Sequence, residues 1–348
     1  MTEKKSGLTK KIIISLAVII VIALGITVFN YYLRYFGPNV TGEKKYLYIK
    51  TGATFDDVFK TVKDSNIVKD TTYFLWTAHN MDYTTRVKPG RYTLKKGMSN
   101  RGLINMLKAG NQEPVKLKFH NIRLKKDFAK YISTQLETDS TSLLDLLNSS
   151  DFVGKYGFTT DNVYAMFIPN SYEVYWNTPA DKFFKRMYDE YQKFWTAERK
   201  QKAQAIGLTE QQVSSLAAIV DAEALHDDEM PMIAGLYMNR YKKGMKLEAD
   251  PTVIFATGDF NIHRVLNKHL RTESPYNTYL HTGLPPGPIM MPSIKAIDAV
   301  LNYKKHDFIY MVAKEDFSGY HNFSSNMAQH LAYAHKFQAA LDERNIKK

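Results

Sequence analysis

Residues 209–223 read TEQQVSSLAAIVDAE, a sequence that combines a helix start signal with an apolar face. Thr209, followed three residues later by Gln212, is typical of a capping box, in which each side chain bonds the backbone amide of the other residue. Apolar residues then recur at the three- and four-residue spacing of one helix face. The stretch therefore predicts a helix that begins after Thr209 and packs one face into a core.

The last position on that face is occupied by an acid. Val213, Leu216 and Val220 define the face, Glu223 follows on it, and Asp221 is turned about 100° away from Val220. A carboxyl group among apolar side chains is disfavoured as an anion, so its pKa should rise and make Glu223 a candidate general acid. The residues alone leave two alternatives open: Glu223 is held in a salt bridge, or the helix ends before it.

Downstream of this helix, residue types that commonly build carbohydrate clefts recur between turns. Amides, hydroxyls and tyrosine rings suit sugar hydroxyls and ring faces, and the rigid segment 283–289 (GLPPGPI) suits a cleft wall. Each group taken alone also occurs in ordinary turns. The residues that we predict to bind substrate are Asn239, Arg240, Asp250, Thr252, Tyr276, Asn277, Tyr279, His321, Asn326 and His330.

The sequence predicts no metal and no cofactor. The ten histidines include no His-Glu-x-x-His pattern, and the chain has no cysteine. A phosphate-binding Walker loop, a dinucleotide glycine fingerprint and a Gly-x-Ser-x-Gly nucleophile motif are also absent. The lack of cysteine further excludes disulfides and thiolate catalysis.

The N-terminal segment has the composition of a membrane span. Residues 12–29 include no charged side chain, and a helix extended to Leu33 would reach about 33 Å, the thickness of a hydrocarbon core. Basic residues precede the run and aromatic residues follow it, which places the N-terminus in the cytoplasm and everything after Arg34 outside. The flanking residues are Lys4, Lys5, Lys10, Lys11, Tyr31 and Tyr32.

A cleaved signal peptide is the alternative for this segment. Ala23 and Gly25 would offer a poor cleavage site, and the apolar run continues past them. We therefore favour an uncleaved anchor in the inner (cytoplasmic) membrane with a periplasmic or extracytoplasmic catalytic domain. Either interpretation exports the remainder of the chain.

Length and charge limit the classes of protein that remain. At roughly 150 residues per domain, 348 residues suggest about two globular units, and 44% hydrophobic content argues against disorder or a multi-span transporter. The net charge of +12 favours an anionic partner such as nucleic acid, anionic lipid or a carboxylate-rich polymer. Because the folded part is exported, we expect an envelope polymer and no nucleic acid.

We divide the chain at changes in composition and pattern. Residues 1–34 form the cytoplasmic tip and anchor, 35–44 a linker, 45–112 a small β/α module, and 113–348 the domain with the candidate acid. The module has a weak internal repeat in which IKTGAT at 49–54 is echoed by LKKGMS at 94–99. Each copy predicts a strand, a glycine turn and a capped helix. Such a module could bind glycan or space the next domain from the membrane.

Taken together, these residues resemble the endolytic murein transglycosylases of the MltG, or YceG-like, family. Weaker likeness extends to PNSY at 169–172 and KPGRY at 88–92. The main likeness lies in IVDAE at 219–223, Asn239-Arg240, DPTV at 250–253, YNTY at 276–279, GLPPG at 283–287 and the tail with His321, Phe323, Asn326 and His330. The resemblance implies an α+β fold with one transmembrane helix, a LysM-like module at 45–112 and a mixed α/β catalytic domain at 113–348.

The resemblance also implies an activity. Glu223 would be the catalytic glutamate of a lytic transglycosylase that cleaves the MurNAc-β-1,4-GlcNAc bond and leaves a 1,6-anhydroMurNAc end. We expect Asp250 to be a second electrostatic group and Asp221 a surface or supporting carboxylate. The expected partners are peptidoglycan glycan strands, the membrane and peptidoglycan synthases, with the enzyme terminating nascent strands.

Two other functions stay open at this point. In a hydrolytic muramidase, Asp250 or Asp221 would position a water or attack C1, and the product would have a reducing end. In a peptidoglycan-binding scaffold without activity, Glu223 would be structural.

Overall fold

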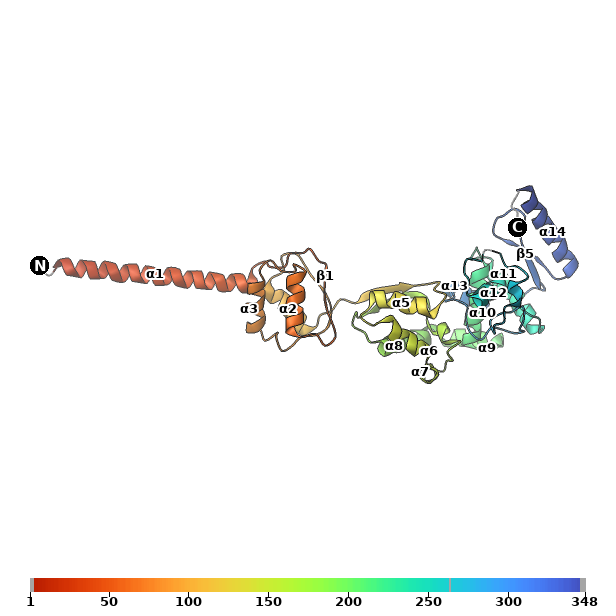
Figure 1. Ribbon diagram of the computed structural model, residues 1–348, viewed down its shortest axis with the longest axis horizontal. Helices are drawn as coiled ribbons and strands as arrows, with labels where there is room; N and C mark the ends of the chain where they lie inside the picture. Colours follow the sequence, from red (N-terminus) through yellow and green to blue (C-terminus); the bar gives the residue numbers. More distant parts are fainter. Residues whose placement is uncertain (1–2, 263, 345–348) are drawn as a thin grey trace. The chain divides into compact units, whose positions relative to one another are not determined.

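The computed structural model describes residues 3–262 and 264–344, which divide into two units (Figure 1). The first unit comprises residues 1–115 and 173–177, and the second comprises 116–172 and 178–348. Helices account for most of the described residues, and the strands among them form three separate two-stranded sheets. The predicted mixed α/β class is confirmed, whereas our segment boundaries stay a prediction.

Helix α1 (Glu3–Phe36) is a long apolar helix whose side chains from Leu8 to Phe29 are exposed. Within the described part of the chain, it is the one helix long and apolar enough to cross a membrane, a test that signal sequences also pass. Its last turn is fixed to the first unit, because Thr77 Oγ1 and Asn100 Nδ2 each donate a hydrogen bond of 2.9 Å to the Arg34 carbonyl. An apolar helix that is exposed from Leu8 to Phe29 is consistent with the predicted anchor.

The rest of the first unit is built around one antiparallel strand pair. Strand β1 (Tyr46–Ile49) pairs with β2 (Gly90–Thr93), with Tyr46 opposite Thr93 and Ile49 opposite Gly90. Three helices pack with this pair around a single core: α2 (Phe55–Asp64), α3 (Thr71–Asn80) and α4 (Asn100–Ala109). Fully buried side chains of that core include Val62, Phe74, Tyr83, Tyr92, Leu103 and Leu107.

The caps predicted from the internal repeat are present. Thr54 and Asp57 form a complete capping box at the start of α2, and Ser99 caps α4 by accepting a hydrogen bond from the Gly102 amide. Gly110 ends α4 with a φ of 74°, a left-handed conformation that glycine adopts without steric cost. Both copies thus have the predicted strand, glycine turn and capped helix, and α3, capped by Asp70, is an additional helix between them that was not predicted.

The second unit is mainly helical. Strands β3 (Val115–Phe119) and β4 (Asn170–Val174) pair, and β5 (Tyr310–Ala313) pairs antiparallel with β6 (His321–Ser324). Its helices are α5 (Lys125–Gln135), α6 (Ser140–Asn148), α7 (Ser150–Gly154), η1 (Val163–Met166), α8 (Ala180–Phe194), α9 (Ala197–Ala205), α10 (Glu210–Glu223), α11 (Met230–Lys242), α12 (Asp250–Thr257), η2 (His269–Arg271), α13 (Ile294–Leu301) and α14 (Met327–Glu343).

Helix α10 lies at the centre of this unit, in contact with α9, α11, α12 and α13. The predicted capping box of Thr209 and Gln212 begins it. Every residue from Val213 to Val220 is buried, so the expectation of a single buried face was wrong. Small side chains explain the difference, since Ala217 and Ala218 let other helices approach, and the Ser214 hydroxyl is satisfied by the Glu210 carbonyl at 3.1 Å.

Helix α14 lies against the β5–β6 hairpin at the C-terminal end of the described chain (Figure 1). No residue of α14 is buried, and all four residues of β5 are half-buried. This subassembly is therefore far less tightly packed than α10 and its neighbours.

Candidate active site

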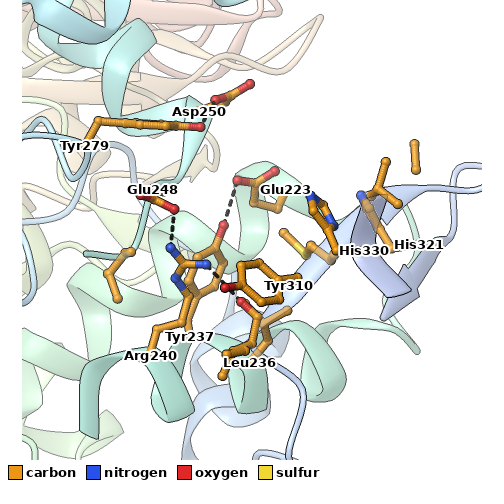
Figure 2. Close-up of a pocket in the computed structure, with 15 residues that line it drawn as sticks. Glu223, Leu236, Tyr237, Arg240, Glu248, Asp250, Tyr279, Tyr310, His321 and His330 are labelled. Atoms are coloured by element: carbon orange, nitrogen blue, oxygen red, sulfur yellow. Dashed lines mark hydrogen bonds and ion pairs between the residues drawn. The ribbon is translucent and has the colours of Figure 1, made fainter. Parts of the chain in front are cut away.

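A cavity of about 300 Å³ lies beside the C-terminal end of α10. Six of the predicted site residues line it (Figure 2): Glu223, Arg240, Asp250, Tyr279, His321 and His330. In this view Glu223 lies between the Asp250–Tyr279 pair and the two histidines. The remaining lining residues are Leu236, Tyr237, Leu247, Glu248, Ile309, Tyr310, Met311, Val312 and Ala313.

Glu223 is the last residue of α10, with Ala224 as its C-cap. The helix thus reaches the acid, and no salt bridge to Glu223 occurs among the described residues, so both structural alternatives for this residue are disfavoured. The end of a helix carries partial negative charge from its free carbonyl groups. The position of Glu223 at the C-terminal end of α10 therefore disfavours the ionised carboxyl group in addition to burial.

One hydrogen bond holds the Glu223 carboxyl group. The Tyr237 hydroxyl, from the facing helix α11, donates to Glu223 Oε1 at 2.8 Å. Burial raises the pKa of Glu223 to about 7, the Tyr237 hydrogen bond lowers it, and the negative charge of Asp250 raises it. The carboxyl group is thus a proton donor poised at neutral pH.

Asp250 provides a second carboxylate at the opposite side of the cavity. It is the first residue of α12 and is exposed, and it accepts a hydrogen bond of 2.7 Å from the Tyr279 hydroxyl. Burial, and then the hydrogen bond to Asp250, raise the pKa of Tyr279, so this tyrosine stays a neutral donor. The two acids of the cavity thus differ in environment, one shielded and one solvated.

Arg240 joins three parts of the cavity wall. Its buried guanidinium donates to the carbonyl groups of Lys246 at 2.8 Å and Ile309 at 2.9 Å, and it forms an ion pair with Glu248. Glu248 has a φ of 53°, in the left-handed region that is unfavourable for a residue with a side chain. Arg240 therefore fixes a strained segment and the start of the β5 strand.

The two histidines lie in β6 and α14. His321 Nδ1 is 2.8 Å from Glu229 Oε2, and its backbone amide donates to Glu229 Oε1 at 2.7 Å. His330 stacks on the Tyr310 ring with centroids 5.2 Å apart. Burial, and then the nearby Arg240, lower the pKa of His330, so it is neutral at pH 7.

Five predicted substrate-binding residues do not line the cavity and instead hold the chain around it. Asn239 donates to the carbonyls of His306 and Phe308, Asn277 to those of Leu270 and Thr272, and Asn326 caps α14. Thr252 bonds the Ala249 carbonyl and the Thr278 hydroxyl, and Tyr276 packs its ring on Phe255. A direct contact of these residues with substrate stays a prediction, and their internal hydrogen bonds give them a supporting position.

Asp221 bonds another part of the protein, and its role as a supporting carboxylate stays a prediction. It accepts hydrogen bonds from the backbone amide and the hydroxyl of Ser293, at 2.8 and 2.9 Å, and does not line the cavity. Ser293 is the N-cap of α13, so this contact fixes α13 against α10.

Sequence reasoning missed Tyr237, Glu248, Tyr310 and Glu229. Each acts through a partner on another element, and no local pattern reveals such pairs. Tyr237 alone had a usable signal, because a tyrosine inside an apolar helix usually needs a partner for its hydroxyl. Among the described residues, no group of three or more His, Asp or Glu side chains could hold a metal ion.

Comparison with known proteins identifies relatives over most of the chain. A family model described as the YceG-like family matches residues 47–336. An endolytic murein transglycosylase of Bacillus subtilis (strain 168) is 36% identical over 130 residues, covering 37% of this chain and 35% of that protein. A protein of the same name from Streptococcus pneumoniae R6 is 26% identical over 326 residues, covering 82% of this chain and 57% of that protein.

A solved structure is similar in fold. The crystal structure of a yceG-like protein from Listeria monocytogenes superposes with a TM-score of 0.57 and 23% identity, covering 82% of this chain and 97% of that one. The present chain spans only 35% and 57% of the length of the two curated relatives.

Proposed function

This chain belongs to the YceG-like family, and from that premise we propose that it is a membrane-anchored endolytic murein transglycosylase. The observation that carries the proposal is Glu223, a shielded carboxyl group whose pKa is raised to about 7 by burial and which faces a cavity. The names of the relatives support the same activity. The substrate would be the glycan strand of peptidoglycan, with cleavage between MurNAc and GlcNAc.

The proposed reaction uses Glu223 twice. As an acid, it gives its proton to the oxygen that links MurNAc C1 to GlcNAc, and the C1–O bond breaks as oxocarbenium character develops. As a carboxylate, it then takes the proton of the MurNAc 6-hydroxyl, whose oxygen bonds to C1. The products are a GlcNAc 4-hydroxyl and a 1,6-anhydro ring, no water is consumed, and the acid is regenerated.

Neighbouring residues have distinct parts in this scheme. Tyr237 stabilises the Glu223 carboxylate that exists between the two proton transfers. Asp250, opposite Glu223 in the cavity, would stabilise positive charge at C1. Tyr279, His321 and His330 offer the sugar hydroxyls donors and acceptors at the cavity surface.

Hydrolysis is the second candidate function, because Asp250 gives the cavity a second carboxylate that could orient a water. The product separates the two reactions. A 1,6-anhydro end is lighter than a hydrolytic end by one water and resists borohydride reduction. We expect mass spectrometry of digested strands to find only non-reducible anhydro ends, and reducible ends throughout would establish a muramidase.

The test of catalysis compares Glu223→Gln with a matched control. Full-length protein in detergent is incubated with purified sacculi, and Glu273→Gln, which changes an exposed acid outside the cavity, is the control. We expect Glu223→Gln to lose at least about a thousandfold in rate and the control to retain wild-type rate. Equal product from Glu223→Gln would refute Glu223 as the catalytic acid, and no product from either protein would leave only a peptidoglycan-binding scaffold.

We further propose that α1 is an uncleaved single-pass anchor with the catalytic domain outside, and that residues 45–112 form a LysM-like module. The exposed apolar surface of α1 supports the anchor, and the β1–β2 pair that encloses α2 and α3 in sequence supports the module. Because the chain has no cysteine, Lys44→Cys and Lys4→Cys can be labelled one at a time in intact cells. A membrane-impermeant maleimide should reach only position 44. Location near the membrane fits an enzyme that terminates nascent strands beside synthases.

A further inference from the structure

A second and smaller cavity is lined by chain neighbours of the two acids, Glu223 and Asp250. Its volume is about 80 Å³, and its lining is apolar except for one arginine. Ala222 of this cavity immediately precedes Glu223, and its Pro251 immediately follows Asp250, so it lies one residue away from both acids. The other lining residues are Arg123, Ile254, Phe255, Phe260, Ile289 and Met290.

Arg123 is the polar group of this cavity. Its guanidinium lies over the Phe260 ring, 5.0 Å from the centroid, and the side chain is exposed. Among the described residues it makes no hydrogen bond and no ion pair, so its donors are available. The chain beside it is fixed, because the Met291 amide donates to the Ile122 carbonyl at 3.1 Å.

The size and chemistry of this cavity select a small acyl group. At about 80 Å³ it is well below the roughly 300 Å³ of the smallest ordinary ligand pockets, so a sugar ring does not fit. Apolar walls suit a methyl group, and a guanidinium at the rim suits a carbonyl oxygen. An acetamido group has both a methyl group and a carbonyl oxygen, and the methyl carbon and the oxygen are two bonds apart.

We propose that this cavity binds the N-acetyl group of the amino sugar beside the scissile bond. The methyl lies among Ile254, Phe255 and Phe260, and the carbonyl oxygen accepts a hydrogen bond from Arg123. This inference rests on the proposed function and adds a determinant of specificity to it. Two residues that line the cavity, Ala222 and Pro251, are chain neighbours of Glu223 and Asp250. Binding of the acyl group therefore also positions the sugar relative to both acids.

An acyl-size series tests the proposal directly. Glycan strands are chemically de-N-acetylated and then re-acylated with acetic or propionic anhydride, and kcat/KM is measured with the full-length protein in detergent. We expect the wild-type protein to cleave propionylated strands about tenfold more slowly than re-acetylated ones, because a small pocket penalises one extra methylene. Equal rates on both strands would overturn the proposal.

Enlarging the cavity should restore the larger substrate. We expect Ile254→Ala, and separately Phe260→Ala, to raise the propionyl-to-acetyl ratio of kcat/KM about tenfold. Damage to the fold would lower both rates and leave that ratio unchanged, so the gain is specific. Leu266→Ala, which truncates an apolar side chain outside both cavities, is the matched control and should keep the wild-type ratio. An unchanged ratio in both enlarged variants would also refute the proposal.

Substitution of Arg123 provides a second test of the proposal. We expect Arg123→Ala to lower kcat/KM on re-acetylated strands about tenfold, whereas Arg86→Ala, which removes an equally exposed charge from the first unit, has no such effect. If Arg123 instead bound a carboxylate of the stem peptide, its removal would matter only on peptide-bearing strands, and acyl size would be irrelevant. If re-acetylated strands are not cleaved at all by the wild type, the proposed function fails first, and the two failures are distinguishable.

Discussion

Removing the Tyr237 hydroxyl should shift the proton affinity of Glu223 upward. This hydroxyl is the one hydrogen-bond donor to the Glu223 carboxyl group among the described residues, at 2.8 Å from Oε1. It lowers the pKa of Glu223 against the raising effects of burial and of Asp250. Tyr237→Phe keeps the ring and its packing and deletes only the donor.

The size of the shift follows from the difference between two hydrogen bonds. A bond to a charged acceptor is worth about 2 kcal/mol, and one to the neutral acid about 1 kcal/mol. The difference of about 1 kcal/mol corresponds to nearly one pKa unit, at about 1.4 kcal/mol per unit. The pKa of Glu223 should therefore move from about 7 to about 8.

The pH dependence of kcat on purified glycan strands measures this shift. The rate should fall as Glu223 ionises, so the alkaline limb should have its midpoint near pH 7 in the wild type and near pH 8 in Tyr237→Phe. Below pH 6, the variant should be about fivefold slower, since the carboxylate formed after proton delivery has lost its donor and about 1 kcal/mol of stabilisation. The variant thus gains relative rate as pH rises.

Tyr241→Phe is the matched control. Tyr241 lies one turn further along α11, does not line the cavity, and its hydroxyl makes no hydrogen bond among the described residues. Its alkaline limb should coincide with that of the wild type. A limb that stays in place or moves to lower pH in Tyr237→Phe would refute the assignment of the limb to a carboxyl group held by Tyr237.

Three further predictions concern stability. Glu223→Gln should raise the free energy of unfolding in urea at pH 8.5 by up to about 3 kcal/mol. At that pH the folded wild type must ionise a carboxyl group whose pKa is raised from 4.5 to about 7. The gain should vanish at pH 4, where this group is protonated in both the folded and the unfolded state, and an equal gain at both pH values would contradict this cause. Arg240→Ala should cost about 3 kcal/mol in the same measurement, because it leaves buried carbonyls and Glu248 without their donor; weaker substrate binding with unchanged stability would instead indicate a direct contact with glycan. Gly287→Ala should lower the melting temperature by several degrees, because the added Cβ would lie 2.0 Å from the Asp161 carbonyl oxygen; Gly154→Ala, with nothing within 4 Å, should leave it unchanged.

Local signals in the sequence were sufficient for the helix that carries the acid. The capping box at Thr209 and Gln212 acts within four residues, so it was predictable, and the helical spacing placed Glu223 against the core. The packing of α10 on all sides was not predictable, because the small residues that permit it are equally common on exposed faces. Helix α3 was missed for a similar reason: its sequence, TTYFLWTAHN, has a weak amphipathic pattern that only its contacts with α1 and α4 explain.

Six of the predicted site residues line one cavity, but the sequence did not reveal what the other five would bond. Residue types suited to sugars drew attention to Asn239, Thr252 and Asn277, but amides and hydroxyls suit backbone carbonyls equally well, and these three bond the protein itself. The Tyr237–Glu223 bond depends on how α10 and α11 face each other. Such a contact between elements leaves no periodic trace in either segment.

The walls of the cavity beside Glu223 differ in how tightly they are packed. Glu223 lies on a helix that is packed on every side, whereas the wall that includes His321 and His330 is formed by β5, β6 and α14, and α14 has no buried residue. Because its helix is held on every side, Glu223 cannot shift toward a bound glycan strand. We therefore expect any structural adjustment on binding to occur in the C-terminal hairpin and helix. Backbone amides of α14 should accordingly exchange with deuterium orders of magnitude faster than those of α10, and a bound strand should slow the former and hardly alter the latter.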